Sequence, residues 1–358
     1  MFAKKTLVAA AALLALVGAA QADVKLYGMV DMSAGSFETA HAKGASNRVT
    51  AVQSGQMMTS YFGISGSEDL GGGLKAEFAL ESFLNADTGA NAPNLAGGFW
   101  GRGSFVALNG GFGKVALGQY DNPLFTSGYT YNPFGSSMAF SPTMRHFYSG
   151  GDFAALGFDT GFVNSVTYET PNLSGFSAVA QFAPKETTAP NTQNSYSVAA
   201  TYAAGPFGAT LTYVKGGLGS TTAKTAYFAD QKVIDLGTSY DFGVVKAFAQ
   251  YTSVKSKSFW DASTPSVFAT GLDTKATIYQ IGASVPVSDK GAVLVSFGEN
   301  KTKDAGVTYK DRVFSVGYDH NLSKRTDVYV VFSNNQQSAT TTNDESGQTF
   351  AFGIKHNF

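Results

Sequence analysis

The segment from Gln348 to Phe358 (QTFAFGIKHNF) constrains the fold of this chain more than any other stretch. Large side chains alternate along it with small or polar ones, and the large set is Phe350, Phe352, Ile354, His356 and Phe358. Because successive side chains of a strand point to opposite faces, one face of this segment is apolar and aromatic. A strand of a soluble sandwich can show this pattern. A membrane β-barrel requires it, since its outer face contacts lipid and its lumen contacts water.

The first 22 residues have the pattern of a secretory signal peptide. Two lysines supply the positive start, Leu7–Val17 supplies the apolar stretch, and Ala20–Ala22 supplies the small-x-small cleavage site. A membrane-anchoring helix is the alternative, but the apolar run is short for spanning a bilayer. We therefore expect residues 1–22 to be a removed signal peptide and residues 23–358 to form a single outer-membrane β-barrel domain.

Composition limits how such a chain can be stabilised. It has no cysteine and therefore no disulfide framework, and charged residues make up only 14% of it, whereas Phe and Tyr together number 46. Beyond the signal no run of about 20 apolar residues occurs, which excludes helical membrane spans. Without the two signal lysines, 23 basic residues remain against 26 acidic ones. This balance is too mild to indicate a nucleic-acid partner.

Short turns and long polar loops alternate along the chain. The short turns, rich in Gly, Asn, Asp and Pro, lie at 68–73, 109–113, 171–175, 204–208, 241–243, 288–291 and 319–326. The longer loops lie at 36–57, 84–98, 122–161, 184–194, 215–230, 255–274, 299–310 and 333–347. Seven turns and eight loops predict an all-β fold, a transmembrane antiparallel β-barrel of about 16 strands. Its first and last strands should pair, residues 25–32 beside 350–358. A soluble all-β sandwich or a secreted solenoid is the alternative.

Charged residues fall mostly on the strand parity opposite the aromatic residues. Charge on the lipid face costs about 2–4 kcal/mol at the membrane midplane, so this sorting identifies the lumen side. Arg102 is assigned to the lumen on its charge alone, because its parity also contains Val106 and Leu108. Each charge could instead be a solvated charge at the rim. The residues predicted to line the pore wall are Asp31, Tyr61, Glu77, Glu81, Arg102 and Lys355.

Five sequence stretches carry a resemblance to a known family: Leu26–Asp31 (LYGMVD), Phe62–Phe78 (FGISGSEDLGGGLKAEF), Gly111–Tyr120 (GFGKVALGQY), Asn164–Phe176 (NSVTYETPNLSGF) and Gly353–Phe358 (GIKHNF). With these stretches the chain resembles the trimeric porins of Gram-negative outer membranes, in particular the beta-proteobacterial type. The resemblance covers essentially all of residues 23–358. It implies a sixteen-stranded homotrimer that passes small hydrophilic solutes and whose third extracellular loop folds into the lumen as a constriction. It also implies that Phe358 is part of the assembly signal read by the outer-membrane insertion machinery.

The longest loop, residues 122–161, stands where this constriction is expected. Loops of about 40 residues are uncommon within a domain and are usually functional. Its many aromatic residues favour packing against the inner wall, although an external loop making subunit contacts is the alternative. Its charged residues are predicted to influence ion preference, and they are Arg145, His146, Asp152 and Asp159. For His146, a proton switch is a weaker second hypothesis.

The sequence departs from the family where ion selectivity is decided. Relatives commonly carry arginines where Tyr61, Gln119 and Thr167 stand here, whereas Arg102 matches a family arginine. We therefore expect a weakly selective pore that leans towards cations. Outer-membrane lipid and lipopolysaccharide are the expected surroundings of the barrel.

The functional prediction is an outer-membrane porin, a passive diffusion channel for small hydrophilic solutes and ions in the Gram-negative outer membrane. The alternative is a surface adhesin or receptor that uses the barrel as a scaffold for its loops. We expect neither an enzyme nor a cofactor or metal site. The four histidines lack metal-ligand spacing, and no nucleophile motif flanks them: His41, His146, His320 and His356.

Overall fold

The structure is a computed structural model that describes residues 23–42, 47–91, 98–149, 154–186, 193–218, 227–260, 273–304, 306–340 and 344–358. The expected signal peptide and Asp152 lie outside the described residues. Among the described residues, no helix is long and apolar enough to cross a membrane.

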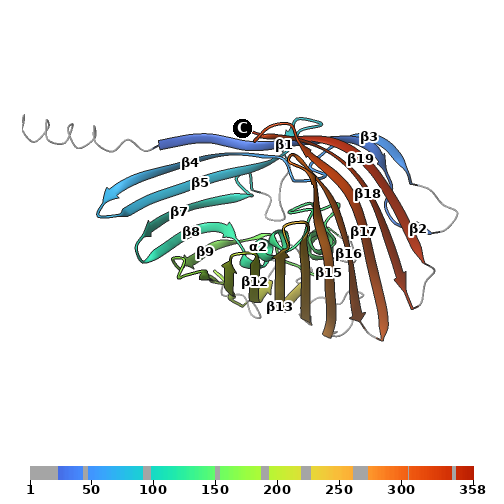
Figure 1. Cartoon of the computed structure of the whole chain (residues 1–358). Helices are drawn as coiled ribbons and strands as arrows, with labels where there is room; N and C mark the ends of the chain where they lie inside the picture. Colours follow the sequence, from blue (N-terminus) through green and yellow to red (C-terminus); the bar gives the residue numbers. More distant parts are fainter. Residues whose placement is uncertain are drawn as a thin grey trace, which may run out of the picture.

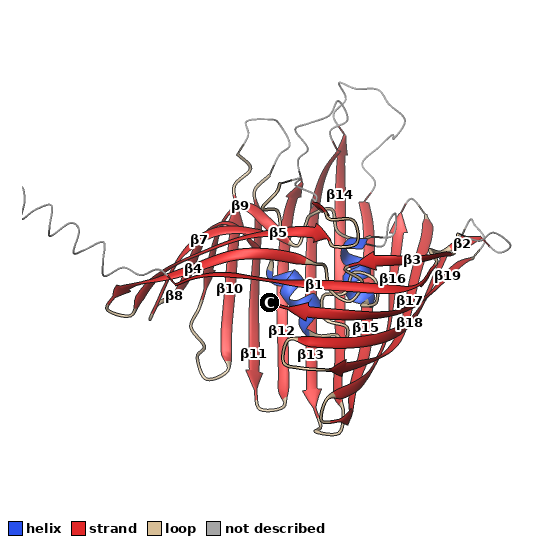
Figure 2. Cartoon of the chain, turned by 90° about the horizontal axis from the view of Figure 1, so that it is seen from above, coloured by secondary structure: helices blue, strands red, loops and turns tan. Residues whose placement is uncertain are grey.

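Sixteen antiparallel strands form the wall of a closed barrel. Figures 1 and 2 show how the strands curve around a common interior. The predicted fold class is therefore confirmed. The strands are β1 (Asp23–Phe37), β4 (Tyr61–Gly71), β5 (Leu74–Asn85), β7 (Gly103–Gly110), β8 (Gly113–Asp121), β9 (Gly161–Glu169), β10 (Phe176–Ala183), β11 (Ser195–Ala204), β12 (Phe207–Leu218), β13 (Tyr227–Asp241), β14 (Lys246–Trp260), β15 (Asp273–Ser288), β16 (Gly291–Asp304), β17 (Val307–Asn321), β18 (Thr326–Ala339) and β19 (Glu345–Asn357).

Short accessory elements complete the wall and occupy the lumen. The small strands are β2 (His41–Ala42), β3 (Val49–Ser54) and β6 (Ala90–Asn91), and the helices are α2 (Pro123–Thr130), α3 (Pro142–Met144) and the π-helical turn η1 (Arg145–Ser149). Strand β3 pairs with the second half of β1, whereas β4 pairs with its first half. The second strand of the wall is therefore interrupted between residues 54 and 61.

The barrel closes by pairing β1 with β19, so that neither strand is left with an unpaired edge in lipid. The register runs from Met29 opposite Asn357 to Ser36 opposite Phe350, about four residues further along β1 than expected. Phe358 extends the seam, because its amide donates to the Gly28 carbonyl at 3.1 Å and its carbonyl accepts from the Gly28 amide at 3.3 Å. A side chain at Gly28 would collide with the Phe358 ring.

The seven predicted short turns all join consecutive strands at one rim. Both ends of the barrel sequence lie there too, since Asp23 pairs with Ser67 and the Asn357 amide bonds to the Arg325 carbonyl. Strands β13 to β19 are 13 to 16 residues long, well beyond the expected length. The predicted loops 299–310 and 333–347 are therefore mostly strand, because polar residues continue the backbone pairing beyond the apolar band.

The outer surface of the barrel carries a band of exposed apolar side chains, as the alternating pattern predicts. In β19, Phe352 is 61% exposed while its neighbour Ala351 is fully buried. The same alternation places Leu26, Leu211 and Ile281 on the outside of three other strands. This surface suits contact with lipid.

Candidate functional site

The segment that follows β8 folds into the lumen, and Figure 2 shows its helices inside the ring of strands. Asn122 caps α2, since its side-chain oxygen accepts from the Leu124 amide at 2.9 Å, and Pro123 takes the first helical position. Ser141 and Pro142 begin α3 in the same way. We refer to residues 122–149 and 154–160 as the constriction loop.

Polar side chains of the wall hold the constriction loop. Asn122 donates to Gln181 at 3.1 Å, and Ser127 donates to the carboxylate of Asp235 at 2.6 Å. Further along, the amide and the hydroxyl of Thr143 both donate to the side-chain oxygen of Gln280, at 3.0 and 2.8 Å. The loop is therefore attached to three different strands.

Apolar packing supports the same attachment. Leu124, Phe147 and Phe158 are buried in one cluster with wall residues Val214, Val233, Val254, Ala276 and Ile278. Phe134 and Phe140 are buried in a second cluster that includes Leu294, Tyr329 and Val331. The principal core of this protein thus lies between the loop and the inner wall, and it confirms that the loop folds inward.

Glycine residues in the wall, which have no side chain, allow the constriction loop to pack directly against the backbone of the strands. A Cβ atom added at Gly237 would lie 2.1 Å from the Tyr131 ring, and one added at Gly282 would lie 2.6 Å from Pro133. Gly298 faces Pro142 in the same way, at 2.6 Å. Sequence reasoning missed these contacts. The sequence did contain a signal for them, namely glycine residues within strands at positions that face the lumen. Such glycines often mark the close approach of another segment.

The opposite part of the wall carries a charged aromatic cluster. The hydroxyl of Tyr27 donates to Glu81 at 2.5 Å, and Arg102 donates to the other oxygen of the same carboxylate. The Arg102 guanidinium also lies over the Tyr61 ring, 4.0 Å from its centre. Three predicted wall residues, Tyr61, Glu81 and Arg102, are thus brought together.

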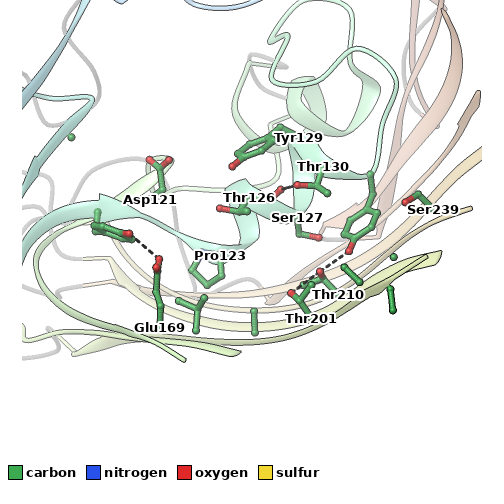
Figure 3. A pocket seen from close by; sticks show the side chains of 18 of the residues that line it. Asp121, Pro123, Thr126, Ser127, Tyr129, Thr130, Glu169, Thr201, Thr210 and Ser239 are labelled. Carbon is green, nitrogen blue, oxygen red and sulfur yellow. Dashed lines mark hydrogen bonds between the residues drawn. The ribbon is translucent and has the colours of Figure 1, made fainter. Parts of the chain in front are cut away.

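A cavity of about 830 Å³ separates this cluster from α2. Figure 3 shows Asp121, Tyr129 and Glu169 around it. Glu169 accepts a hydrogen bond from Tyr120 at 2.8 Å. The charged side chains among the described lining residues are four carboxylates and two cations: Glu81, Asp121, Glu169, Asp241, Arg102 and Lys246. Sequence reasoning missed Asp121 and Glu169, although both lie at the ends of strands that flank the loop.

The other predicted wall residues do not line this cavity. Glu77 accepts from Lys114 at 2.9 Å and from Asn109 at 3.0 Å, and Lys355 pairs with Asp327 at 3.3 Å.

Asp31 is fully buried beneath the interruption between β3 and β4. Its carboxylate accepts from the backbone amides of Met57 and Met58 and from the Tyr329 hydroxyl. The structure therefore places Asp31 in a buried hydrogen-bond site rather than at a water-filled surface.

The predicted loop residues that the structure describes, Arg145, His146 and Asp159, do not line this cavity either. Arg145 is half-buried, donates to Asn335 at 3.4 Å and borders a smaller cavity of about 230 Å³. Burial and the neighbouring charge of Arg145 lower the pKa of His146 to about 3. His146 is therefore neutral at physiological pH, which disfavours a proton switch there. Asp159 accepts from the amide of the next residue, Thr160, at 2.7 Å.

A closed barrel with an apolar exterior and a loop anchored in its lumen defines an outer-membrane β-barrel channel. The sequence profile of the Gram-negative porins matches residues 8–340, and the chain belongs to this family. The resemblance seen in the sequence is thereby confirmed.

Relatives and solved structures support the same assignment. The chain is 34% identical over 346 residues to Outer membrane porin protein 32 of Delftia acidovorans, covering 94% of this chain and 91% of that protein. It is 30% identical over 400 residues to an outer membrane porin protein of Bordetella pertussis, covering 99% and 100%. The structure of an anion-selective porin from Comamonas acidovorans matches with a TM-score of 0.71 at 27% identity, covering 94% of this chain and 100% of that one.

This protein is therefore a porin of the Gram-negative outer membrane, as predicted. The porins are a family of channels and not a family of enzymes.

Proposed function

We propose that this porin passes small hydrophilic solutes and ions by passive diffusion, with a weak preference for cations. The charge balance of the 830 Å³ cavity is the observation that carries this proposal. Four carboxylates border it against two cationic side chains, and one of those, Arg102, is already bound to Glu81. Charges beside a narrow aqueous passage set the local concentration of ions of opposite sign.

The positions where relatives carry arginine support the same preference. Tyr61 lies beneath Arg102, Gln119 donates to the Gly101 carbonyl, and Thr167 accepts from Gln181 at 3.0 Å. All three side chains are uncharged, and each contacts a neighbouring residue of the wall or of the segment before β7. The Comamonas acidovorans porin is anion-selective, so the two proteins should differ in the sign of their preference.

The test is the reversal potential of the purified protein in a planar bilayer with a potassium chloride gradient. We expect a small reversal potential whose sign shows that potassium ions pass more readily than chloride ions. A strongly anion-selective potential would overturn the proposal, and an absence of conductance would favour a barrel-scaffolded adhesin or receptor instead.

The porin further acts as a homotrimer in contact with outer-membrane lipid and lipopolysaccharide, without catalytic activity and without a nucleic-acid partner. Residues 1–22 are removed on export in this proposal. The family resemblance supports these points, and a mass measurement in mild detergent that found only monomer would contradict the trimer.

Assembly depends on Phe358 in this proposal, because its backbone extends the seam between β1 and β19. Deletion of Phe358 should lower the amount of heat-modifiable trimer in the outer membrane. Conductance of the channels that do assemble should be nearly unchanged. Unaltered trimer levels would show that the insertion machinery does not need this residue.

A further inference from the structure

Five lysines form a continuous row across neighbouring strands near the long-loop rim. The register places Lys215 opposite Lys232, Lys232 opposite Lys255, Lys255 opposite Lys275, and Lys275 opposite Lys303. Strands β12 to β16, which carry them, lie side by side in Figure 1. We call these five residues the lysine row.

The lysine row lies on the outer surface of the barrel. The residues that alternate with it, including Val214, Val233 and Val254, pack against the constriction loop inside the lumen. Nearer the membrane midplane, the outer parity of the same strands carries the exposed side chains of Tyr251 and Tyr279. Tyrosines at such positions mark the boundary between lipid tails and head groups. The lysine row is therefore located beyond this boundary, towards the long-loop rim.

The positive charge of the row is not neutralised within the described part of the chain. None of its lysines lies within ion-pair distance of a carboxylate there. Lys257, in the next row outwards, differs from them in having an acidic residue, Asp230, as a register partner. Like charges directly opposite one another destabilise a sheet. A run of five is therefore expected to have an external anionic partner.

A hollow beside the row has the chemistry of a phosphate site. It measures about 270 Å³ and is lined by Lys275, Lys301 and Lys303, together with Thr277 and Tyr279. Its one carboxylate, Glu299, is already bound to Arg312 at 2.6 Å. Lysine ammonium groups bind phosphate oxygens through charge-assisted hydrogen bonds.

We propose that the lysine row and this hollow bind the phosphate groups of lipopolysaccharide in the outer leaflet. This inference rests on the proposed contact with that lipid and specifies where it occurs. Two observations favour a lipid over a free anion. The row runs laterally across five strands, and it lies directly beyond the lipid-facing tyrosines.

The experiment measures binding of lipid A to the detergent-purified full-length porin by native mass spectrometry, with bisphosphorylated and dephosphorylated lipid A as probes. The row variant combines Lys232→Gln, Lys255→Gln and Lys275→Gln. Its matched control removes three exposed lysines at the short-turn rim, by Lys75→Gln, Lys290→Gln and Lys324→Gln.

The row variant should bind bisphosphorylated lipid A roughly 100-fold more weakly, since each of the three basic residues near an anionic surface contributes about a fivefold gain. The control should bind as the unmutated protein does. Dephosphorylated lipid A should bind weakly to all three proteins. Replacement of the same three row lysines by arginine should keep the affinity, and this also shows that the strands tolerate substitution there.

Equal weakening in the row variant and the control would overturn the proposal, as would equal affinity for the two probes. Competition by millimolar inorganic phosphate would reassign the hollow to a free anion and would also overturn it. If the row variant fails to fold, Lys255→Gln is compared with Lys257→Gln, and only the first should weaken binding. The reversal potential depends on the charges inside the pore, whereas lipid A binding depends on the outer surface. Failure of the proposed ion preference can therefore be distinguished from failure of the proposed lipid site.

Discussion

The inner wall of this porin has two unlike sides. The charged side comprises β1, β4, β5, β7, β8 and β9 with Arg102, and it supplies four of the six charged side chains around the cavity. The packed side, β10 to β18, lies under the constriction loop mostly with small, apolar or amide side chains. Its carboxylates at Asp235 and Asp311 are fully buried, and Asp235 accepts from Ser127, Gln250 and Thr252. Most of the charge around the cavity and most of the loop attachment are thus provided by different strands.

The strands of the wall also differ in length along the barrel. Strands β7 to β10 have eight or nine residues, whereas β13 to β19 have 13 to 16. The constriction loop leaves the wall after β8 and rests mainly against the longer strands. The longer wall provides the larger area for its attachment.

The largest effect on the channel is expected when a glycine on the packed side is replaced by a larger residue. Gly237→Val would place side-chain atoms inside the Tyr131 ring, and such overpacking costs about 1–3 kcal/mol. The loop should shift into the lumen space or detach, so single-channel conductance should change markedly while ion preference is kept.

Two further variants sharpen this result. Gly111→Val serves as the control, because nothing lies within 4 Å of the added atom. Tyr131→Ala in the Gly237→Val background should recover much of the lost stability. A conductance unchanged by Gly237→Val would show that the loop does not depend on this contact.

The second largest expected effect is a loss of stability of the folded protein at low pH. The pKa of His146 is lowered to about 3 in the folded protein, against about 6.5 for a free histidine. Between these values only the unfolded chain binds the proton, so His146 lowers stability progressively as pH falls below 6.5. At pH 5 the loss is about 2 kcal/mol.

Heat-modifiability measured at pH 5 and pH 8 checks this expectation. His146→Gln should reduce the difference between the two pH values, whereas His356→Gln, at an exposed histidine, should leave it unchanged. If both variants behave alike, the loop is not the acid-sensitive part of the barrel.

A smaller effect is expected on the charged side. Glu81→Gln removes the carboxylate that binds Arg102 and leaves the arginine charge facing the cavity. A unit charge about 6 Å from an ion in water interacts by about 0.7 kcal/mol, so the permeability ratio should move towards anions by up to roughly threefold. Asp235→Asn, on the packed side, should destabilise the barrel without moving the ratio. The reverse outcome would contradict the division between the two sides.

The smallest effect is expected at Arg145. Arg145→Ala should shift the reversal potential slightly further towards cations and lower conductance only modestly, because Arg145 is half-buried and does not border the main cavity. Arg312→Ala, whose side chain pairs with Glu299 on the outer face, should not shift the potential. A shift larger than that of Glu81→Gln would place the selective region at the loop instead.

Strand alternation and turn positions could be predicted because both depend on residues near one another in sequence. The period of two located the outer face of β19, and Gly, Asn, Asp and Pro located the short turns. The placement of Asp31 could not be predicted, because the amides that bind it come from a break in another strand. Arg102 was correctly assigned to the lumen from its charge alone. Its contacts with Glu81 and Tyr61 could not be predicted, because these two residues lie on other strands.

The glycines beneath the constriction loop have a consequence for how such channels diversify. Tyr131, Pro133 and Pro142 of the loop occupy the space that side chains would fill at Gly237, Gly282 and Gly298, so the loop and its wall are fitted to each other. If the loop alone were moved into a related barrel that has larger side chains at the three glycine positions, it would not pack against the wall. New permeation properties should therefore arise more readily by exchanging single charges around the passage than by shuffling whole loops between lineages.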